Sequence, residues 1–473
     1  MSEALATGLE ADGRLVGWPS PPVALLTRPR VAPRTPPRGA AVLGAPSAGE
    51  LLLSVRVLAE AARAGRAPAR CPPLQADLVA PERVAIDYGS PEELAARAEL
   101  AARALALEPG PGARAMWRAL RPRGVFRGRG GAARVAFLYS GQGSQYPNML
   151  ARLRASEPVV RDVFDEADRL MAPMLGRPLT ELVFVDGSDP AAHAWSEESM
   201  RPIEVTQPAV LAADLALARL LDVYGAGSDM VMGHSLGEYA ALVSAGCLTF
   251  AEALEVVSGR AGEMRHMEGA DPGVMLAVIA PLEEIEGAVA AVGAGAMIAN
   301  VNSTSQAVVG GPTEAVRRLA QRLRAAGRDA VELPVSHAFH TPIVSPLSGP
   351  LRATLDRIEL RPPRMPVVSN LTGRLYPMEP GRVSEVRELM ARQLAAPVQF
   401  VAGLRTLHQM GARVFVEVGP KRALQGFADD VLGGYDDVLT LSSNHPKTGE
   451  LESFNHALCG LFASGLGAGR PRH

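Results

Sequence analysis

Cysteine is nearly absent from this chain of 473 residues. The three cysteines, Cys71, Cys247 and Cys459, lie far apart in the sequence. Their spacing is not that of a zinc site, and so few cysteines argue against a disulfide framework. The chain therefore fits a reducing compartment, and we expect it in the cytoplasm.

The sequence also lacks a strong excess of charge and a long apolar run. Its formal net charge of −2 gives no general reason to expect nucleic acid or an anionic membrane as a partner. No uninterrupted apolar run reaches the length of a membrane span. The first residues, Met1-Ser2-Glu3-Ala4, lack the basic-then-apolar order of a secretion signal. We therefore expect neither a nucleic-acid nor a membrane partner.

Hydrophobic residues are plentiful, at 47% of the chain, which is enough for a large core in two or three units. Residues 1–45 are rich in Pro, Arg and Gly without periodicity and predict a flexible lead-in. Residues 46–130 predict a small domain, in which Ser90 caps a helix that runs to about Leu107. Residues 441–473 are mixed and end rich in Gly, so we expect a surface wrap and a frayed tail.

A serine between two glycines organises the middle of the chain, in Gly233-His234-Ser235-Leu236-Gly237. An apolar stretch precedes this motif and a helical pattern follows it, which is the order of a nucleophile elbow. The glycines permit the sharp turn, and the free N–H groups of the following helix can face a developing negative charge. The alternative is an idle serine in a turn, so the rest of the chain must supply a base, an oxyanion donor and a pocket.

A glycine-rich loop follows another buried strand. Residues 133–139 form the apolar run, and Ser140-Gly141-Gln142-Gly143-Ser144-Gln145 comes directly after it. Glycines at the end of a strand let the backbone approach a ligand closely. The loop lacks the Gly-Lys-Ser/Thr ending of a phosphate-binding loop, which argues against a nucleotide cradle.

Residues 271–335 show a separate pattern of secondary-structure elements. They read as strand, helix, strand, strand, helix, strand, which is the order of the ferredoxin-like motif. No catalytic signature lies within them. We expect an insert in a larger α/β domain made of residues 131–270 and 336–440, where the insert can form one wall of a cleft.

Two histidines, His337 and His340, lie three positions apart in the loop that leaves this insert. They could ligate a metal, but no third ligand of a suitable type lies nearby, so we expect no metal site. A base for Ser235 is the favoured role, because the loop lies at the junction of the two units.

Arg260 falls on the apolar face of a helix that runs from Phe250 to about Met267. A buried arginine is costly unless it meets a carboxylate. Two partners are open. One is a protein acid such as Glu238 or Glu263, and the other is the carboxylate of a substrate, held in a bidentate fork.

Four stretches stand in one order along the chain: the loop 141–145, the serine motif, Arg260 and His337-Ala338-Phe339-His340. In this combination the chain resembles the acyltransferase family of malonyl-CoA:acyl-carrier-protein transacylases and the acyltransferase domains of polyketide and fatty-acid synthases. The resemblance covers about residues 133–440. It implies an α/β fold with an α/β-hydrolase-like core and an inserted ferredoxin-like subdomain, preceded by a small α+β linker domain.

The resemblance assigns catalytic roles to residues that match the family's motifs. It makes Ser235 the nucleophile and His340 the base. It places the backbone N–H groups of Gln142 and Leu236 in the oxyanion hole. It also gives the backbone carbonyl of Gln393, within the helix expected over residues 383–394, the task of orienting His340, where hydrolases place an acid.

The resemblance further implies how the substrate is chosen. Arg260 would grip the free carboxylate of the extender unit, which favours the second of its two readings. Leu236 and the His-Ala-Phe-His loop resemble malonyl-selective members, whereas methylmalonyl-selective ones usually carry Gln and Tyr-Ala-Ser-His. Phe339 would close the space that a 2-methyl group needs. The thioester of CoA is the substrate, and no cofactor is implied.

Residues 46–130 are similar to the linker that joins a ketosynthase to an acyltransferase. Three short stretches resemble synthases of the polyunsaturated-fatty-acid or enediyne kind. They are Ala85-Ile86-Asp87-Tyr88-Gly89, Ala115-Met116-Trp117 and Ser443-Asn444-His445-Pro446. The implied partners are malonyl-CoA, an acyl carrier protein and a ketosynthase.

The function expected from these features is ping-pong transfer of a malonyl group from malonyl-CoA to the phosphopantetheine thiol of an acyl carrier protein, through a malonyl ester on Ser235. One alternative is an acyl hydrolase or thioesterase on the same scaffold, although the oxyanion loop of the His-Gly-Gly kind is absent. The other is a catalytically inactive docking module of a synthase, against which the complete set of catalytic residue types argues.

Overall fold

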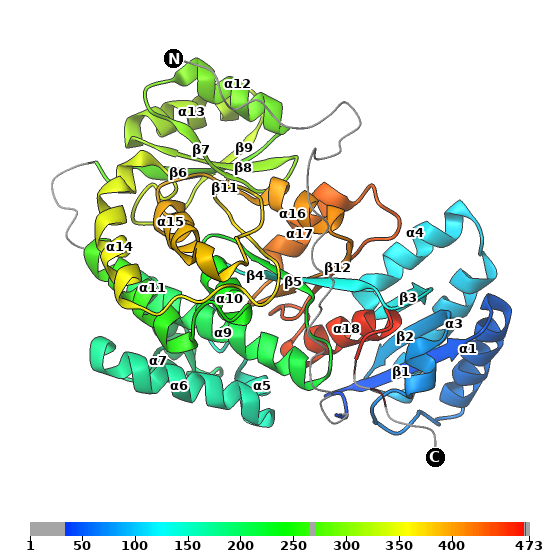
Figure 1. Ribbon diagram of the computed structural model, residues 1–473. Helices are drawn as coiled ribbons and strands as arrows, with labels where there is room; N and C mark the ends of the chain where they lie inside the picture. The colour runs from blue at the N-terminus through cyan, green and yellow to red at the C-terminus, as the bar shows by residue number, and fades with distance from the viewer. Residues whose placement is uncertain (1–33, 265–270, 468, 470–473) are drawn as a thin grey trace.

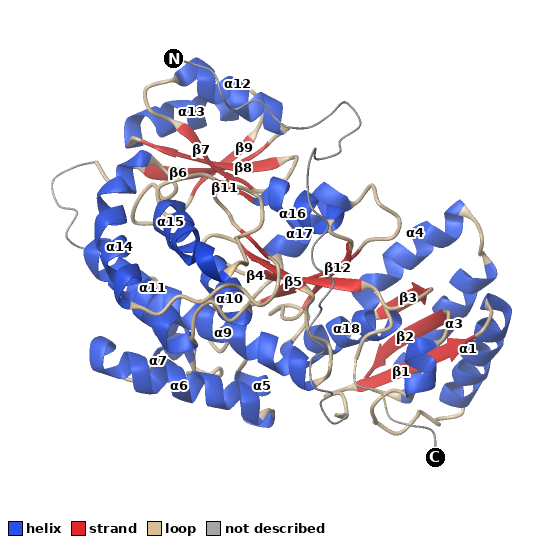
Figure 2. Ribbon diagram, viewed as in Figure 1, coloured by secondary structure: helices blue, strands red, loops and turns tan. Residues whose placement is uncertain are grey.

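The computed structural model describes residues 34–264, 271–467 and 469, and three sheets form the frame of that part. Figure 1 shows the parallel sheet with β4, β5 and β12 between the other two, which lie at the top and at the lower right. Figure 2 shows helices around all three sheets. The fold is therefore a mixed α/β architecture.

The first sheet belongs to an N-terminal unit. Its strands β1 (Gly39–Ala45), β2 (Glu82–Tyr88) and β3 (Val125–Arg129) are antiparallel, with β2 in the centre. Helices α1 (Ala48–Arg63) and α3 (Pro91–Ala106) pack against each other and against β2. Ser47 and Ser90 cap these helices, each accepting a backbone N–H at 3.2 Å, and Ser90 was the expected cap. Two shorter helices complete the unit, α2 (Gln75–Val79) and α4 (Pro111–Leu120).

Strand β1 corrects the expected lead-in. Residues 39–45 do not form a flexible segment, because they pair along their whole length with β2, from Gly39 opposite Tyr88 to Ala45 opposite Glu82. Small residues give β1 little apolar alternation, so its sequence reads like a linker, and the ladder to β2 supplies its order. The first 33 residues of the expected lead-in lie outside the described residues.

Five parallel strands form the second sheet, in the order β10-β5-β4-β12-β13. They are β10 (Val367–Val368), β5 (Met230–Gly233), β4 (Arg134–Tyr139), β12 (Ala412–Val418) and β13 (Leu439–Ser442). Alternate residues of β4 enter two different apolar clusters, Phe137 on one face and Leu138 on the other. Both faces are covered, which explains the near-continuous apolar runs of these strands.

Helices cover the two faces of this sheet. On one face lie α6 (Pro158–Leu175), α9 (Ile203–Val223), α10 (Gly237–Ser244) and α11 (Phe250–Met264). On the other lie α16 (Phe400–Gln409) and α17 (Ala423–Leu432). Helices α14 (Ser348–Arg357) and α15 (Val383–Gln393) pack on each other beside α11, and α5 (Ala151–Ser156), α7 (Leu179–Val183) and α8 (Pro190–Ser199) connect β4 to α9.

The third sheet has the strand order β11-β7-β8-β6-β9. Its strands are β6 (Val274–Ile279), β7 (Met297–Val301), β8 (Gln306–Gly311), β9 (Asp329–Glu332) and β11 (Val398–Gln399). Helices α12 (Leu282–Val292) and α13 (Thr313–Ala325) lie on its outer side in Figure 1. Strand β11 comes from the segment after α15 and pairs in parallel with β7, so the sheet is joined to the rest of the fold by hydrogen bonds.

Helix α18 (Glu450–Ala463) corrects the expected surface wrap at the C-terminal end. Nearly all of its residues are buried, and it packs against β2, β3 and β13. Asn455 donates from Nδ2 to the carbonyl oxygen of Gly39 at 3.0 Å, and Glu450 accepts the backbone N–H of Arg152 at 2.8 Å. A helix apolar on most sides becomes a core element, and α18 therefore binds the N-terminal unit to the parallel sheet.

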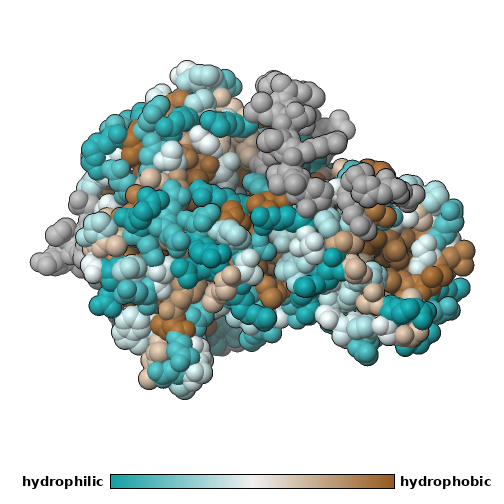
Figure 3. All heavy atoms as spheres, turned by 90° about the horizontal axis from the view of Figure 1, so that it is seen from below, coloured by the Kyte–Doolittle hydropathy of each residue, from teal (hydrophilic) through white to brown (hydrophobic). Residues whose placement is uncertain are grey.

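The surface is mixed in polarity. Figure 3 shows apolar side chains gathered over the right-hand end of the molecule, where the N-terminal unit lies. Leu53 and Val57, one turn apart on α1, are 62% and 66% exposed.

None of the helices in the described ranges combines the length and the apolar character that a membrane crossing requires.

Candidate active site

Ser235 stands at the turn between β5 and α10. Its φ of 52° is left-handed, a conformation that is strained for serine. A Cβ on Gly233 would lie 1.9 Å from the carbonyl carbon of Gly237, and one on Gly237 would lie 2.3 Å from the carbonyl oxygen of Tyr139. Both glycines of the motif are therefore required for this turn, which presents the serine at the end of a central strand.

His340 faces Ser235 from the loop after the third sheet. Its Nε2 lies 2.6 Å from Oγ of Ser235, and its Nδ1 lies 3.1 Å from the carbonyl oxygens of both Gln393 and Ala396. Carbonyl oxygens only accept hydrogen bonds, so Nδ1 carries the proton and Nε2 can accept the serine proton. The loop and the motif, 105 residues apart, thus form a serine–histidine pair.

Gln393 holds both members of this pair. Its backbone carbonyl accepts from His340, and its side-chain Nε2 donates to the backbone carbonyl of Ser235 at 2.9 Å. It is the last residue of α15 and is buried. The next residue, Leu394, accepts the backbone N–H of His340 at 3.0 Å. The C-terminal end of α15 therefore fixes the histidine from two sides.

Asn370 is a site residue to which the sequence analysis gave no role. Its Oδ1 accepts the backbone N–H of Ser235 at 2.6 Å, and its Nδ2 donates to the carbonyl oxygen of Gly233 at 2.7 Å. A signal was present, because Asn370 follows the buried strand β10, and the carboxyl ends of neighbouring parallel strands meet at one edge. Since β10 pairs with β5, Asn370 reaches the serine turn.

Glu238 is the second residue of α10, three positions after the serine. Its Oε1 accepts the hydroxyl of Tyr376 at 2.6 Å and the backbone N–H of Asn370 at 3.0 Å. Burial raises the pKa of Glu238 to about 7, although these hydrogen bonds act in the opposite direction. The sequence leaves Glu238 open as an ion-pair partner of Arg260. It gives no indication that Tyr376 contacts Glu238.

His234 connects the serine motif to the third sheet. Its Nε2 lies 2.7 Å from Oδ1 of Asn302, which follows β7, and its ring packs against Phe400 and Phe427. Burial lowers the pKa of His234, so the neutral ring is favoured. The third sheet is therefore hydrogen-bonded to the residue next to Ser235.

The predicted oxyanion donors, Gln142 and Leu236, lie on the two segments that meet at the serine. A Cβ on Gly141 would lie 2.6 Å from the carbonyl oxygen of His234, so the glycine loop passes directly against the serine motif. Within the described residues, the backbone N–H groups of Gln142 and Leu236 have no protein acceptor. Two open N–H donors beside a serine are the feature an oxyanion hole needs.

The remaining predicted residues are less fully placed. Phe339 is buried, and its ring lies 6.3 Å from that of His337, centroid to centroid. His337 is partly exposed and contacts Oγ of Ser336 at 3.0 Å. Arg260 belongs to α11, but its side chain and that of Glu263 lie outside the described residues, so neither reading of Arg260 is decided by the structure.

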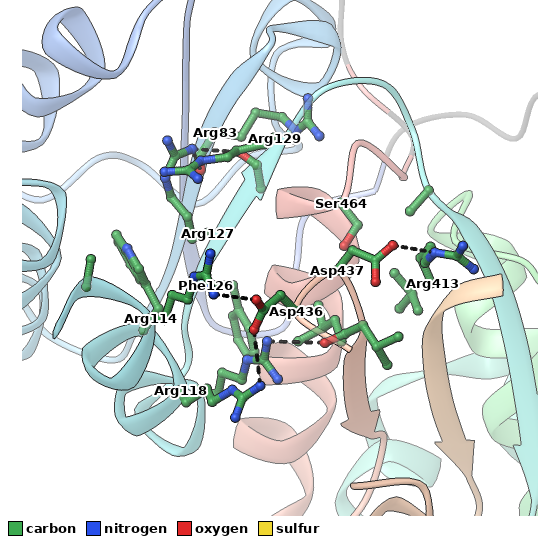
Figure 4. A pocket seen from close by; sticks show the side chains of 18 of the residues that line it. Arg83, Arg114, Arg118, Phe126, Arg127, Arg129, Arg413, Asp436, Asp437 and Ser464 are labelled. Carbon is green, nitrogen blue, oxygen red and sulfur yellow. Dashed lines mark hydrogen bonds and ion pairs between the residues drawn. The ribbon is translucent and has the colours of Figure 1, made fainter. Parts of the chain in front are cut away.

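A cavity of about 740 Å³ lies elsewhere, between the N-terminal unit and the edge of the parallel sheet. Figure 4 shows that arginine side chains dominate its lining, among them Arg114 and Arg413. Arg114 pairs with Asp436 at 2.5 Å and Arg413 with Asp437 at 2.6 Å. None of the predicted site residues lines this cavity.

Known proteins share both the sequence and the fold. Residues 136–454 match the acyl transferase domain family. The spectinabilin polyketide synthase system protein NorB of Streptomyces orinoci is 35% identical over 332 residues, which are 69% of this chain but only 15% of that protein. The chain thus spans a small part of the length of such relatives.

Two solved structures illustrate the similarity of fold. The acyltransferase domain from the second module of the salinomycin polyketide synthase is 30% identical, with a TM-score of 0.66 over 90% of this chain and 94% of that one. The malonyl CoA-acyl carrier protein transacylase of Coxiella burnetii is 30% identical, with a TM-score of 0.60 over 70% of this chain and 97% of that one. On these grounds, the chain belongs to the acyl transferase domain family.

Proposed function

We propose that this chain transfers a malonyl group from malonyl-CoA to the phosphopantetheine thiol of an acyl carrier protein. The observation that carries the proposal is the contact of 2.6 Å between Ser235 Oγ and His340 Nε2, with Nδ1 held by backbone carbonyls. Similarity to named malonyl transacylases, and to one solved together with a type II acyl carrier protein, supports the substrate and the acceptor.

The first half-reaction acylates the serine. His340 Nε2 takes the proton of Ser235 as Oγ attacks the thioester carbon of malonyl-CoA. The oxyanion that forms is stabilised by the backbone N–H groups of Gln142 and Leu236, each contributing about 10²–10³ in rate. The carbon–sulfur bond then breaks, the CoA thiol leaves with the proton from His340, and a malonyl ester remains on Ser235.

The second half-reaction reverses the roles. His340 takes the proton of the carrier's phosphopantetheine thiol, and the thiolate attacks the ester carbon. The same two N–H groups stabilise the second oxyanion, and Ser235 Oγ leaves with the proton from His340. Atoms and charge balance without a metal or cofactor. The carbonyl of Gln393 keeps the His340 tautomer correct in both steps.

Arg260 supplies selectivity in this proposal. Its guanidinium would pair with the free carboxylate of the malonyl group, and an acetyl group would leave that charge unpaired at a cost. We expect Arg260→Ala to lose its preference for malonyl-CoA over acetyl-CoA. The ratio of the two kcat/KM values is the measurement, and an unchanged ratio would remove Arg260 from the site.

Different stretches of the chain would have different roles in this proposal. We infer an α/β-hydrolase-like core at 131–270 and 336–440, supported by five parallel strands and the serine turn. We infer a ferredoxin-like insert at 271–335, supported by the strand order β7-β8-β6-β9 and helices α12 and α13. The N-terminal unit would act as the linker toward a ketosynthase partner, with the cytoplasm as the compartment.

The test compares transfer with hydrolysis. The protein is incubated with radiolabelled malonyl-CoA, with and without a phosphopantetheinylated carrier protein, and labelled carrier and free malonate are counted. We expect label on the carrier at a rate well above malonate release. Rapid malonate release that the carrier does not suppress would instead identify a hydrolase.

A further inference from the structure

The Glu238 carboxyl is linked by hydrogen bonds to the serine turn. Oε1 of Glu238 accepts from Tyr376 at 2.6 Å and from the backbone of Asn370 at 3.0 Å. Asn370 in turn holds the backbone N–H of Ser235 at 2.6 Å. The carboxyl is only 2% exposed and is therefore screened from bulk water. Glu238 thus lies two hydrogen bonds from the backbone of the nucleophile.

Two buried acceptor oxygens, one of this carboxyl and one beside it, lack a proton donor within bonding distance among the described residues. Glu238 and Gln393 line the same small pocket, and the Gln393 side chain lies near enough to the Glu238 carboxyl to lower its pKa. Oε2 of Glu238 and Oε1 of Gln393 are buried, and neither oxygen has a hydrogen-bond partner within bonding distance among the described residues, although the Ser369 side chain, like that of Gln393, lies near enough to the carboxyl to lower its pKa. Nε2 of Gln393 already points to Ser235. A proton on Oε2 of Glu238 would give Oε1 of Gln393 the donor it lacks, and buried polar atoms are costly to leave unpaired.

We propose that Glu238 is a positioning residue that works as a neutral carboxylic acid, its proton fixing the Gln393 amide and thereby the serine–histidine pair. The proton on Oε2 is donated toward Oε1 of Gln393. This orients Nε2 of Gln393 toward the Ser235 carbonyl and leaves the backbone carbonyl of Gln393 in place for His340. The role at Ser235 and His340 rests on the proposed acyl transfer.

Ionisation of Glu238 would undo this arrangement. A carboxylate has no proton to donate, so two acceptor oxygens would face each other and the Gln393 amide would rotate to present Nε2 to Glu238. The bond from Gln393 to Ser235 would then be lost. Burial places the pKa of Glu238 at about 7, so the switch falls within the working range of an enzyme.

The groups that face Glu238 come from three elements. Tyr376 and Ser369 follow β10, Gln393 ends α15, and Tyr239 is its neighbour on α10. Tyr376 stays protonated, because burial raises its pKa well above the ordinary value. Helix α11 also packs against α10, and the side chain of Arg260 on it lies outside the described residues. An ion pair with Arg260 would require an ionised Glu238, so the two arrangements predict opposite protonation states.

The pH dependence of Ser235 acylation tests the proposal. Pre-steady-state labelling from malonyl-CoA is followed between about pH 6 and 9 in the wild type and in Glu238→Gln. A glutamine keeps the donor and the acceptor but cannot ionise. We expect the wild-type rate to fall about tenfold through pH 7 to 8, since small displacements of reacting groups cost about this much or more, and Glu238→Gln to show no such fall.

Glu417→Gln is the matched control. Glu417 on β12 is also fully buried, and burial also raises its pKa to about 7, but its Oε2 accepts the backbone N–H of Gln425 at 2.7 Å, at the start of α17. We expect this variant to keep the wild-type fall. An alkaline fall that persists in Glu238→Gln, or one that disappears in Glu417→Gln, would overturn the proposal.

A second variant and a spectroscopic measurement guard against a folding defect in Glu238→Gln. Tyr376→Phe removes the hydroxyl that favours the ionised carboxyl, so the alkaline fall should move about one unit upward in pH.

The infrared difference between the wild type and Glu238→Gln should contain the carbonyl stretch of a protonated carboxyl at about pH 6, and lose it at about pH 9. Absence of this band at the lower pH would refute the neutral acid. This band is measured without substrate, so a missing acylation activity would count against the proposed function and not against Glu238.

Discussion

Two carboxyl groups of this molecule are equally buried and meet opposite surroundings. Asp87 of β2 accepts from Arg38 at 3.1 Å, from Arg97 at 2.5 Å and from Asn455 at 2.5 Å. Glu238 of α10 meets a tyrosine hydroxyl and a backbone N–H, and none of its described contacts is a cation. The exposed fraction is 0% for Asp87 and 2% for Glu238.

Asp87 has arginine partners and Glu238 has none among its described contacts, and this difference decides which of the two carboxyl groups is ionised. Burial alone would raise the pKa of Asp87, but the nearby His456 ring and the hydrogen bonds from Arg38 and Asn455 bring it well below the ordinary range. Burial raises the pKa of Glu238 to about 7 because its neutral partners only partly oppose it. Asp87 is therefore a fixed charge that joins the N-terminal sheet to α18, while Glu238 can lose or keep its proton beside the candidate active site.

The same arginines argue against a metal near Asp87. Oxygen and nitrogen atoms of Asp87, Glu452 and His456 lie within 4.8 Å of one another, as metal ligands would. Arg38 and Arg97 already occupy the carboxylate of Asp87, and their positive charges oppose a cation at this place. The cluster is better explained as an ion-pair network between two parts of the fold.

Among these variants, the largest effect should come from removing the base of the serine–histidine pair, on the Glu238 side of the comparison. His340 has a left-handed φ of 59°, which asparagine tolerates better than most residues. His340→Asn should therefore fold normally yet lower the acylation rate about 10³–10⁴-fold, because no base remains. Stopped-flow or quench-flow labelling measures the rate. A loss of less than about tenfold would mean that another group is the base.

Breaking the Asp87 network should affect stability instead. Asp87→Asn leaves the partly buried guanidinium groups of Arg38 and Arg97 without their shared, fully buried carboxylate, so we expect a loss of about 3 kcal/mol in the free energy of unfolding. Urea denaturation measures it. The control is Glu99→Gln, which breaks an exposed pair with Arg63 and should cost less than about 1 kcal/mol. Equal losses in the two variants would remove the distinction between buried and exposed pairs.

The pH dependence of stability should separate the two carboxyl groups. Unfolded Glu238 loses its proton near its ordinary pKa of 4.5, whereas the folded state keeps it to about 7. Between these values the folded state binds the extra proton, so raising the pH destabilises it by about 1.4 kcal/mol per pH unit relative to Glu238→Gln. Asp87 has the opposite sign, because its folded pKa is lowered and its contribution is lost as the pH falls. Chemical denaturation at several pH values measures both, and equal pH slopes in the wild type and Glu238→Gln would contradict the raised pKa.

The smallest effect should concern substrate choice. If Phe339 closes the space for a 2-methyl group, Phe339→Ala should raise the ratio of kcat/KM for methylmalonyl-CoA over malonyl-CoA about tenfold, since one methyl group is worth about this much. Competition between the two thioesters measures the ratio. Phe339 is buried, so a thermal melt must accompany the assay. An unchanged ratio in a folded variant would assign malonyl preference to other residues.

Local patterns in the sequence predicted the parts of the site that depend on short stretches of chain. The turn at Ser235 follows from its flanking glycines, and the cap at Ser90 follows from the residues after it. Asn370 and Tyr376 were missed because their roles depend on β10 lying beside β5, a pairing between residues more than 130 positions apart. The same holds for β1 and α18, whose order comes from partners elsewhere in the fold. The role of Arg260 remains a prediction.

Intact-protein mass spectrometry after incubation with a mixture of acyl-CoAs tests acyl transfer through Ser235 most directly. We predict that the wild type gains the mass of one malonyl group in preference to acetyl, and that Ser235→Ala gains none. A malonyl adduct of equal yield on Ser235→Ala, or a wild type that forms no acyl-enzyme from any of the thioesters, would contradict it.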